Sequence, residues 1–233
     1  STFMDITAEL SGTGVIPTYE VGGEIRLPDN RLVDQGWIWI LNLDEDSPYH
    51  TLFYKPLEGA TSFDMGVLPE MTITAWFDPD EASYPGYIRT YYGDVPFWEQ
   101  ATTVHLDHDL NNLQITLLEA PDPGEGSGSA SGSMYEEGGE KKSVRVSSGP
   151  YQGEGTPLDS VPVYLVDMDG SIVHADVTDG QGEFGFTEIA QGDYMLKADY
   201  MGYPMSTSND TLHMTGENDV FEIINNVPED IIN

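Results

Sequence analysis

Two histidines with acidic neighbours form the first group of side chains that could do chemistry. His105 and His108 flank Asp107 in the stretch VHLDHD, which ends at Asp109. Imidazole and carboxylate groups are common zinc ligands. Residues three apart on a strand point to opposite faces of the sheet, so both histidines could bind one metal only if the chain turned between them. The pattern therefore favours a hairpin with solvated polar residues over a metal site.

Two acidic loops are candidates for binding calcium. Asp44 and Asp46 lie in the stretch NLDEDS, and Asp167 and Asp169 lie in DMDGS. Alternating carboxylates in a loop can surround a calcium ion with oxygen ligands. The second loop is not an EF-hand, because the twelfth position counted from Asp167 is Thr178 instead of a glutamate. We prefer solvated turns at both places and keep calcium as the alternative. No other cofactor is predicted.

The stretch YYGDVPFW holds the aromatic side chains most suited to binding a ligand. Tyr91, Tyr92 and Trp98 lie in this loop-like segment. They could form a stacking platform for a glycan or for a neighbouring protein. The alternative is that Trp98 plugs the end of a β-sandwich. Trp37 and Trp39 are two residues apart and share one strand face, so we expect them in the core.

Catalytic motifs are missing from the sequence. It contains no G-x-S-x-G, no H-E-x-x-H and no phosphate-binding G-x-x-x-x-G-K-[ST]. Pairs of carboxylates carry no weight, because a chain with 41 acidic residues contains many by chance. We therefore predict that the chain is not an enzyme.

The charge of the chain excludes several kinds of partner. Among 233 residues, 41 are Asp or Glu and 8 are Lys or Arg, for a net charge of -33. Such a surface repels nucleic acids and anionic membranes. The hydrophobic fraction of 39% and the aromatic fraction of 11% are too high for a disordered acidic tail. Because salt screens self-repulsion, the composition fits a folded, secreted protein adapted to salt.

Cysteine content and hydropathy limit the class of protein further. The chain has no cysteine, which removes disulfides and thiolate metal sites. No apolar run is long enough to span a bilayer, so membrane insertion is not predicted. The chain begins at Ser1, and we expect either a mature protein or an excised fragment.

Short apolar runs must position these side chains. They alternate with polar residues, and Gly, Pro, Asp and Asn separate them, whereas the spacing of an amphipathic helix is nearly absent. This pattern predicts an all-β fold made of two tandem Ig-like or prealbumin-like β-sandwiches. The predicted strands are GWIWILNL (36–43), MTITAWF (71–77), LQITLL (113–118), VPVYLVD (161–167), DYMLKADY (193–200) and VFEII (220–224).

An internal repeat sets the domain organisation. Both halves run through an opening strand, an apolar strand ending in Asp, a strand with Phe, a long strand, a Tyr-Pro pair and a closing pair. The Gly/Ser-rich stretch between the halves reads as a linker. The stretch EKKSVRVSSGPYQGEGTPLDS (140–160) reads as a long loop. The predicted parts are an N-terminal strand-like segment 1–20, domain one 21–119, a linker 120–130 and domain two 131–233.

The second half resembles a known family. VPVYLVD and TDGQGEFGFTEIAQGDYMLKADYMGY are similar to the carboxypeptidase regulatory-like domain, a prealbumin-like β-sandwich. Domain one resembles it more loosely, since it keeps Phe63 and Leu68 but has Glu70, Met71 and Thr72 in place of Gly-x-Tyr. The stretch TYYGDVPFWEQAT resembles modules of secreted surface proteins of Bacteroidetes-type bacteria. The resemblance implies an extracellular or cell-surface location.

These observations predict a non-enzymatic structural or adhesive module, as a subunit of a surface fibre or a stalk of a larger secreted protein. Its protein partners would bind through β-strand edges, and a homo-polymer is one form of this. The segment STFMDITAELSGTG (1–14) is a hypothetical donated strand, or the last strand of a preceding domain. The alternative function is a carbohydrate-binding accessory module that uses Tyr91, Tyr92 and Trp98.

Overall fold

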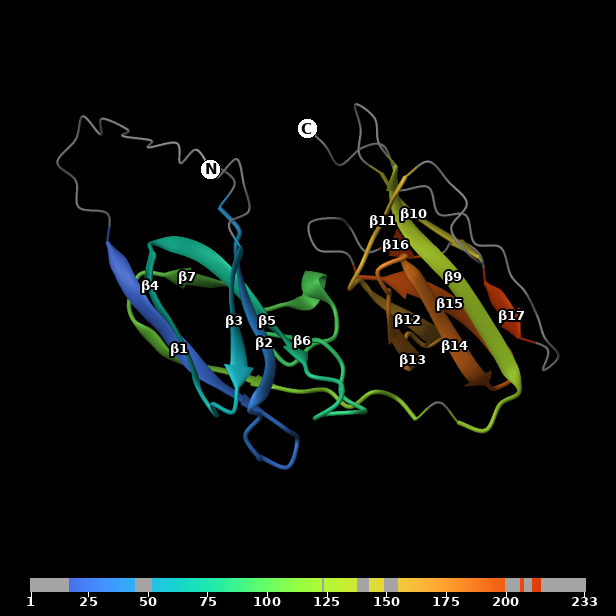
Figure 1. Cartoon of the computed structure of the whole chain (residues 1–233), viewed down its shortest axis with the longest axis horizontal. Helices are drawn as coiled ribbons and strands as arrows, with labels where there is room; N and C mark the ends of the chain where they lie inside the picture. Colours follow the sequence, from blue (N-terminus) through green and yellow to red (C-terminus); the bar gives the residue numbers. More distant parts are fainter. Residues whose placement is uncertain are drawn as a thin grey trace.

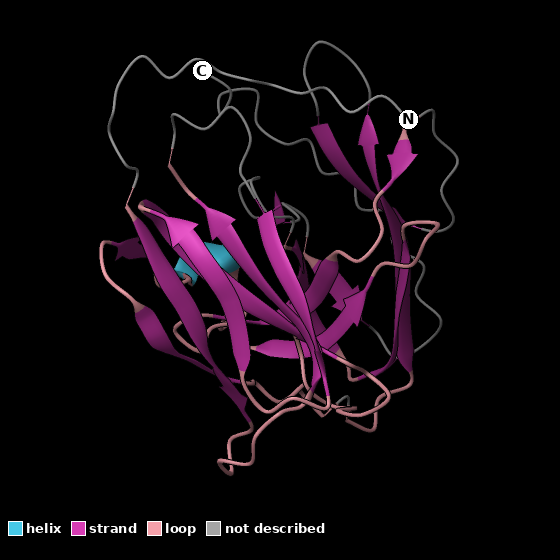
Figure 2. Cartoon of the chain, turned by 60° about the vertical axis from the view of Figure 1, so that its left-hand side comes forward, coloured by secondary structure: helices cyan, strands magenta, loops and turns pink. Residues whose placement is uncertain are grey.

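The computed structural model describes most of the chain between its two ends. The described residues are 17–44, 52–122, 124–137, 143–148, 155–199, 206–207 and 211–214. Three predictions fall outside them: the donated strand 1–14, the closing strand 220–224 and Asp46. Throughout the described part the fold is all-β, with one short 3-10 turn, η1 (Trp98–Gln100) (Figure 2). The predicted fold class is confirmed.

Domain one is a sandwich of two sheets (Figure 1). One has the strand order β4-β1-β8, and the other has the order β3-β2-β5-β6, with β7 also paired to β5. The strands are β1 (Thr18–Arg26), β2 (Gln35–Asn42), β3 (Leu52–Glu58), β4 (Phe63–Pro69), β5 (Met71–Pro79), β6 (Thr90–Tyr91), β7 (Val104–Leu106) and β8 (Leu110–Thr116).

Domain two repeats this arrangement (Figure 1). The order β13-β12-β15-β16, with β17 also on β15, matches β3-β2-β5-β6 with β7 on β5. In the other sheet β9 pairs antiparallel with β14, as β1 pairs with β4, and β9 also pairs with β10 and β11. The strands are β9 (Gly128–Glu137), β10 (Ser143–Ser148), β11 (Thr156–Pro157), β12 (Pro162–Asp167), β13 (Ile172–Val177), β14 (Glu183–Ile189), β15 (Gly192–Ala198), β16 (Ser206–Thr207) and β17 (Leu212–Met214).

Several local predictions are wrong. The stretch predicted as a long loop contains β10, whose SVRVSS sequence alternates as a paired strand requires. The predicted hairpin at His105 and His108 does not form, because β7 pairs with β5 while β8 pairs with β1 in the opposite sheet. The first strand of each domain also begins earlier than predicted, at Thr18 and at Gly128.

Each domain has its own hydrophobic core. The core of domain one is built from residues between Val21 and Leu117, and that of domain two from residues between Met134 and Met214. In β2 the side chains of Ile38 and Ile40 are fully buried in the first core. Two smaller apolar clusters lie outside both cores, and one of them contains residues of both domains.

The described residues contain no helix long and apolar enough to cross a membrane.

Close approach of two strands in domain one requires a glycine. Gly23 of β1 lies opposite Leu113 of β8 in the parallel pair. A Cβ atom at Gly23 would lie 1.8 Å from the carbonyl oxygen of Leu113, which belongs to the backbone and cannot rotate away. The two strands can therefore pair at this spacing only without a side chain at position 23.

We predict that Gly23→Ala destabilises domain one by about 3 kcal/mol or more, because the strands must separate to admit the methyl group. Gly180→Ala is the control, since a Cβ there meets no atom within 4 Å. Urea unfolding followed by tryptophan fluorescence reports on domain one, which holds all four tryptophans. Equal midpoints for the two variants would contradict the prediction.

Candidate functional site

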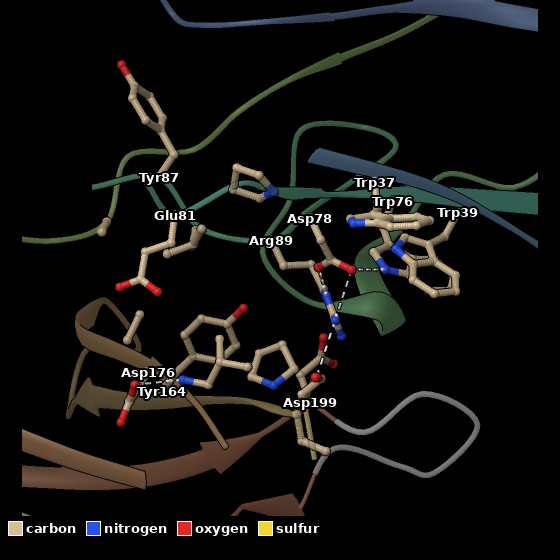
Figure 3. Close-up of a pocket in the computed structure, with 18 of the residues that line it drawn as sticks. Trp37, Trp39, Trp76, Asp78, Glu81, Tyr87, Arg89, Tyr164, Asp176 and Asp199 are labelled. Atoms are coloured by element: carbon tan, nitrogen blue, oxygen red, sulfur yellow. Dashed lines mark hydrogen bonds and ion pairs between the residues drawn. The ribbon is translucent and has the colours of Figure 1, made fainter. Parts of the chain in front are cut away.

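A cleft lies between the two domains. Its volume is about 960 Å³, at the upper end of the range for ligand pockets. Domain one provides the outer face of the β2-β5 sheet, and domain two provides residues around β12 and β13. In Figure 3, Trp37, Trp39 and Trp76 lie on one side, and Glu81 and Asp176 lie toward the other.

Strand alternation and register create an aromatic row on the wall of domain one. In β2, Ile38 and Ile40 point into the core, so Trp37 and Trp39 point outward. Trp39 pairs in register with Tyr54 of β3 on one side and with Trp76 of β5 on the other. These neighbouring positions place four rings on one face of the sheet. The aromatic row consists of Trp37, Trp39, Tyr54 and Trp76.

The rings of the aromatic row contact one another. Trp39 stacks on Trp76 with ring centroids 5.7 Å apart and planes 3° from parallel. Tyr54 lies 4.9 Å from Trp39 and 5.9 Å from Trp37. The exposure of Trp37 is 42% and that of Tyr54 is 60%, so these two rings face solvent. The prediction that Trp37 and Trp39 fill the core is therefore wrong, because the core takes the isoleucines between them.

One polar atom of the aromatic row lacks a partner. The indole Nε1 of Trp39 is buried and makes no hydrogen bond among the described residues. By contrast, the Nε1 of Trp76 donates to Oδ2 of Asp78 at 3.2 Å. A buried donor without an acceptor costs about 1–3 kcal/mol. The wall of the cleft therefore has an unused hydrogen-bond donor.

An ion pair lies between the aromatic row and domain two (Figure 3). Arg89 Nε donates to Oδ1 of Asp78 at 2.5 Å, and Arg89 Nη2 reaches the carbonyl oxygen of Ser160 in domain two at 3.3 Å. The guanidinium also lies 5.9 Å from the ring centroid of Trp76. Burial works against the charge of Arg89, but the Asp78 carboxylate and other neighbours outweigh it and leave its pKa above the usual range.

A buried hydrogen bond joins the domains beside the cleft. The hydroxyl of Tyr91 in β6 donates to Oδ2 of Asp199, which follows β15, at 2.7 Å. The backbone N–H of Trp98 lies 3.4 Å from Oδ1 of the same carboxylate. Both Tyr91 and Asp199 are buried, at 0% and 1% exposure. Burial raises the pKa of Asp199, and burial together with the Asp199 charge raises the pKa of Tyr91.

Apolar side chains surround this bond. Phe97 of domain one packs edge-on against Tyr164 of β12, with ring centroids 5.2 Å apart. Val166 of the same strand belongs to the same cluster. Lys197 of β15 places its ammonium 5.2 Å from the centroid of Phe97, and the Tyr164 hydroxyl lies 3.4 Å from the carbonyl of Pro96. The contact between the domains therefore has an apolar centre with satisfied polar groups.

The three residues of the predicted aromatic platform, Tyr91, Tyr92 and Trp98, do not form one exposed surface, because they pack in different places near the contact between the domains. Tyr91 is fully buried and cannot stack on a ligand, so it does not belong to an exposed platform. Tyr92 packs against the core of domain one. Trp98 packs against the cluster formed by Leu41, Trp76 and Tyr91, in which Trp76 belongs to the aromatic row. The stretch YYGDVPFW thus supplies the junction between the domains.

The two loops predicted to bind calcium lie in different domains, with Asp44 after β2 and Asp167 at the end of β12. Asp44 accepts a hydrogen bond from the backbone N–H of Thr72 at 3.0 Å. Asp167 closes the turn between β12 and β13, since its Oδ1 accepts the N–H groups of Asp169 and Ser171 at 3.0 and 2.8 Å. In the described residues no group of three or more His, Cys, Asp or Glu side chains could hold a metal. Calcium binding stays a prediction.

The histidine pair occupies an exposed connection between the two sheets of domain one. The ring of His105 lies 3.4 Å from Glu70, and that of His108 lies 2.5 Å from Asp107. Each imidazole therefore has a different acidic partner. All four side chains are mostly exposed, which fits the predicted solvated polar residues.

The cleft is not among the features predicted from the sequence, although the sequence contains a signal for it. In WIWIL (37–41) the residues on both strand faces are apolar. Only one face of a strand can point into the core of its own sandwich. The other face must therefore be covered by another domain or by a ligand.

Comparisons with known proteins give distant structural similarities. No protein-family model and no curated protein matches the sequence. Among solved structures, the Bacillus anthracis TIE protein has 14% identity and a TM-score of 0.25, and the match covers 86% of this chain and 32% of that chain. The minor pilin GBS52 of Streptococcus agalactiae has 12% identity and a TM-score of 0.27, covering 86% and 92%. A streptococcal ancillary pilin has 12% identity and a TM-score of 0.30, covering 88% and 62%. The chain thus spans about a third of the TIE protein.

The raised pKa of Asp199 gives a pH-dependent prediction. The folded state holds this proton more tightly than the unfolded chain, so this group's contribution to stability falls as pH rises from about 4 through the folded pKa. Asp199→Asn keeps the shape but does not titrate. Asn offers one acceptor oxygen where Asp199 offers two, which changes stability by an amount that does not depend on pH, and we expect the stability of the variant relative to the wild type to increase from pH 4 to pH 8.

Urea unfolding of both proteins across this pH range measures the difference, in which the titration of the other carboxylates cancels. Val67→Ala, at an exposed position of β4, removes no titrating group; it is the control and should show no such trend. A stability difference between Asp199→Asn and wild type that does not change with pH would refute the assignment.

Proposed function

We propose that the chain is a non-enzymatic module of an extracellular or cell-surface assembly, in which two β-sandwiches are held at a fixed relative orientation. Its work is to space and present neighbouring parts of that assembly. The observation that carries this proposal is the buried contact between the domains. A flexible pair of domains would not need a buried Tyr91–Asp199 hydrogen bond inside an apolar cluster.

The charge of the chain supports the same environment. A net charge of -33 costs stability through self-repulsion in dilute salt, and screening by salt or divalent ions outside the cell lowers this cost. The resemblance of domain two to carboxypeptidase regulatory-like modules of secreted proteins agrees with that location. We extend the proposal to this family relationship and to a bacterial surface protein.

Strand edges are the proposed contacts with other proteins. Within the described residues, β3 and β13 lie at the ends of their sheets. An edge strand presents unpaired N–H and C=O groups that a strand from another chain can pair with. Pro56 within β3 lacks an N–H and makes that edge less suited to pairing. The edge of β13 is therefore the better candidate, and Val177 at its end is 52% exposed.

The fixed relative orientation of the two domains can be tested by measuring the distance between a spin label on each domain. The chain has no native cysteine, so Val67→Cys in domain one and Met168→Cys in domain two give two exposed labelling sites. We expect a single narrow distance distribution. Phe97→Ala should broaden it, because it removes the ring at the centre of the contact, at a cost of about 3–5 kcal/mol.

Leu32→Ala, on an exposed loop of domain one, is the control and should leave the distribution narrow. A broad distribution in the otherwise unmodified protein would overturn the proposal of a fixed orientation.

Assembly through strand edges can be tested by electron microscopy of the concentrated protein. We expect chains or filaments of particles, because β13 can accept a strand from a neighbour. Ala175→Pro in β13 should disperse them, since proline removes an N–H and disfavours a paired strand. Dispersed single particles in the wild type would contradict a homo-polymer.

A further inference from the structure

The aromatic row offers an exposed stacking surface inside a cleft. Trp37 and Tyr54 have exposed rings 5.9 Å apart, and Trp39 and Trp76 continue the row on the same face of the sheet. Large exposed rings are unusual on a domain surface unless they face a ligand or a partner. Because the rings line a cleft, their occupant must enter between the two domains.

Hydrogen-bond acceptors line the rest of the cleft. Glu81 and Asp159 are exposed and have no hydrogen-bond partner among the described residues. Asp176 lies on the same side as Glu81 in Figure 3, and its two oxygens already accept the backbone N–H groups of Val177 and Gly185. Ionised carboxylates only accept hydrogen bonds, so the ligand must bring donors. The wall of domain one adds a donor, the indole N–H of Trp39, which is buried and has no acceptor among the described residues.

We propose that this cleft binds a neutral oligosaccharide. The C–H faces of a pyranose ring stack on Trp37 and Tyr54, and its hydroxyl groups can both donate to carboxylates and accept from an indole N–H. The aromatic row and the carboxylates lie at different ends of the cleft, with the Arg89–Asp78 pair between them (Figure 3). A ligand that contacts both ends must therefore contain more than one sugar ring.

The charges around the cleft limit which class of ligand can bind to its aromatic rings. Nucleic acids and acidic glycans are repelled by the carboxylates of the cleft and by the net charge of the chain. A cation is the competing class, because it is attracted both to ring faces and to carboxylates. Arg89 already provides a positive charge beside Trp76, and it opposes a second cation next to the aromatic row. This favours a neutral ligand.

The inference goes beyond the proposed structural function, and its test is separate. The full chain is applied to an array of neutral and acidic glycans, and the best neutral glycan is then titrated while tryptophan fluorescence is followed. Three of the four tryptophans line the cleft, so binding should change the emission directly. We expect signals for neutral glycans only, with affinities that do not depend on salt.

Variants locate the site. Trp37→Ala and Tyr54→Ala should each weaken binding at least tenfold without lowering the unfolding midpoint, because both rings are exposed. Trp37→Phe keeps an aromatic ring and should retain part of the affinity. Val67→Ala, at an exposed position of β4 outside the cleft, should bind like the wild type.

Three results would overturn the proposal. They are the absence of any neutral glycan signal, binding that survives Trp37→Ala and Tyr54→Ala, and preferential binding of a lysine-rich peptide that weakens with salt. None of them depends on the distance distribution between the spin labels. A cleft that binds no glycan in a rigid protein would thus refute the site alone, and a flexible protein that binds through the aromatic row would refute the fixed orientation alone.

Discussion

Strand β2 of domain one is apolar on both faces, and the rest of the arrangement follows from the need to cover both. Its inward face, with Ile38 and Ile40, is covered by the opposite sheet of the same sandwich. Its outward face carries Trp37, Trp39 and Leu41, and no second sheet of domain one lies over it. Burying aromatic surface is favourable by about 25 cal/mol per Å². Domain two contacts domain one beside this face, at Tyr91 and Phe97, and the face itself forms one wall of the cleft.

The contact between the domains combines an apolar centre with paired polar groups. Phe97 and Tyr164 exclude water, and in the resulting low dielectric the Tyr91–Asp199 hydrogen bond and the Arg89–Asp78 ion pair are stronger than in solvent. The same low dielectric makes each of these groups costly if its partner moves away. Relative motion of the domains would separate Tyr91 from Asp199 and Arg89 from the carbonyl of Ser160, so these polar contacts specify one orientation where apolar contacts alone would allow sliding.

The sequence predicted the fold well and the candidate site poorly. Within the described residues all five of the predicted strands that can be compared appear, because alternation and Gly/Pro punctuation are local signals, and the sixth (220–224) lies outside these residues. The sequence predicts either an aromatic platform at Tyr91, Tyr92 and Trp98 or a plug formed by Trp98, whereas Tyr91 and Trp98 lie at a junction whose other half comes from residues about a hundred positions away. The prediction that Trp37 and Trp39 lie in the core fails because period-two spacing shows that two residues share a face and does not show which face points inward.

By itself, the sequence determined the all-β class, the repeat of two sandwiches and the acidic character of the surface. These properties depend on composition and on short-range alternation, which each segment carries regardless of its neighbours. Only the tertiary structure decided that the outer face of β2 lines a cleft opposite domain two, that Asp199 is buried against Tyr91, and that four aromatic rings form a row on this wall. The physical reason is that burial of a side chain depends on which distant strands cover it, and that depends on the packing of the two domains.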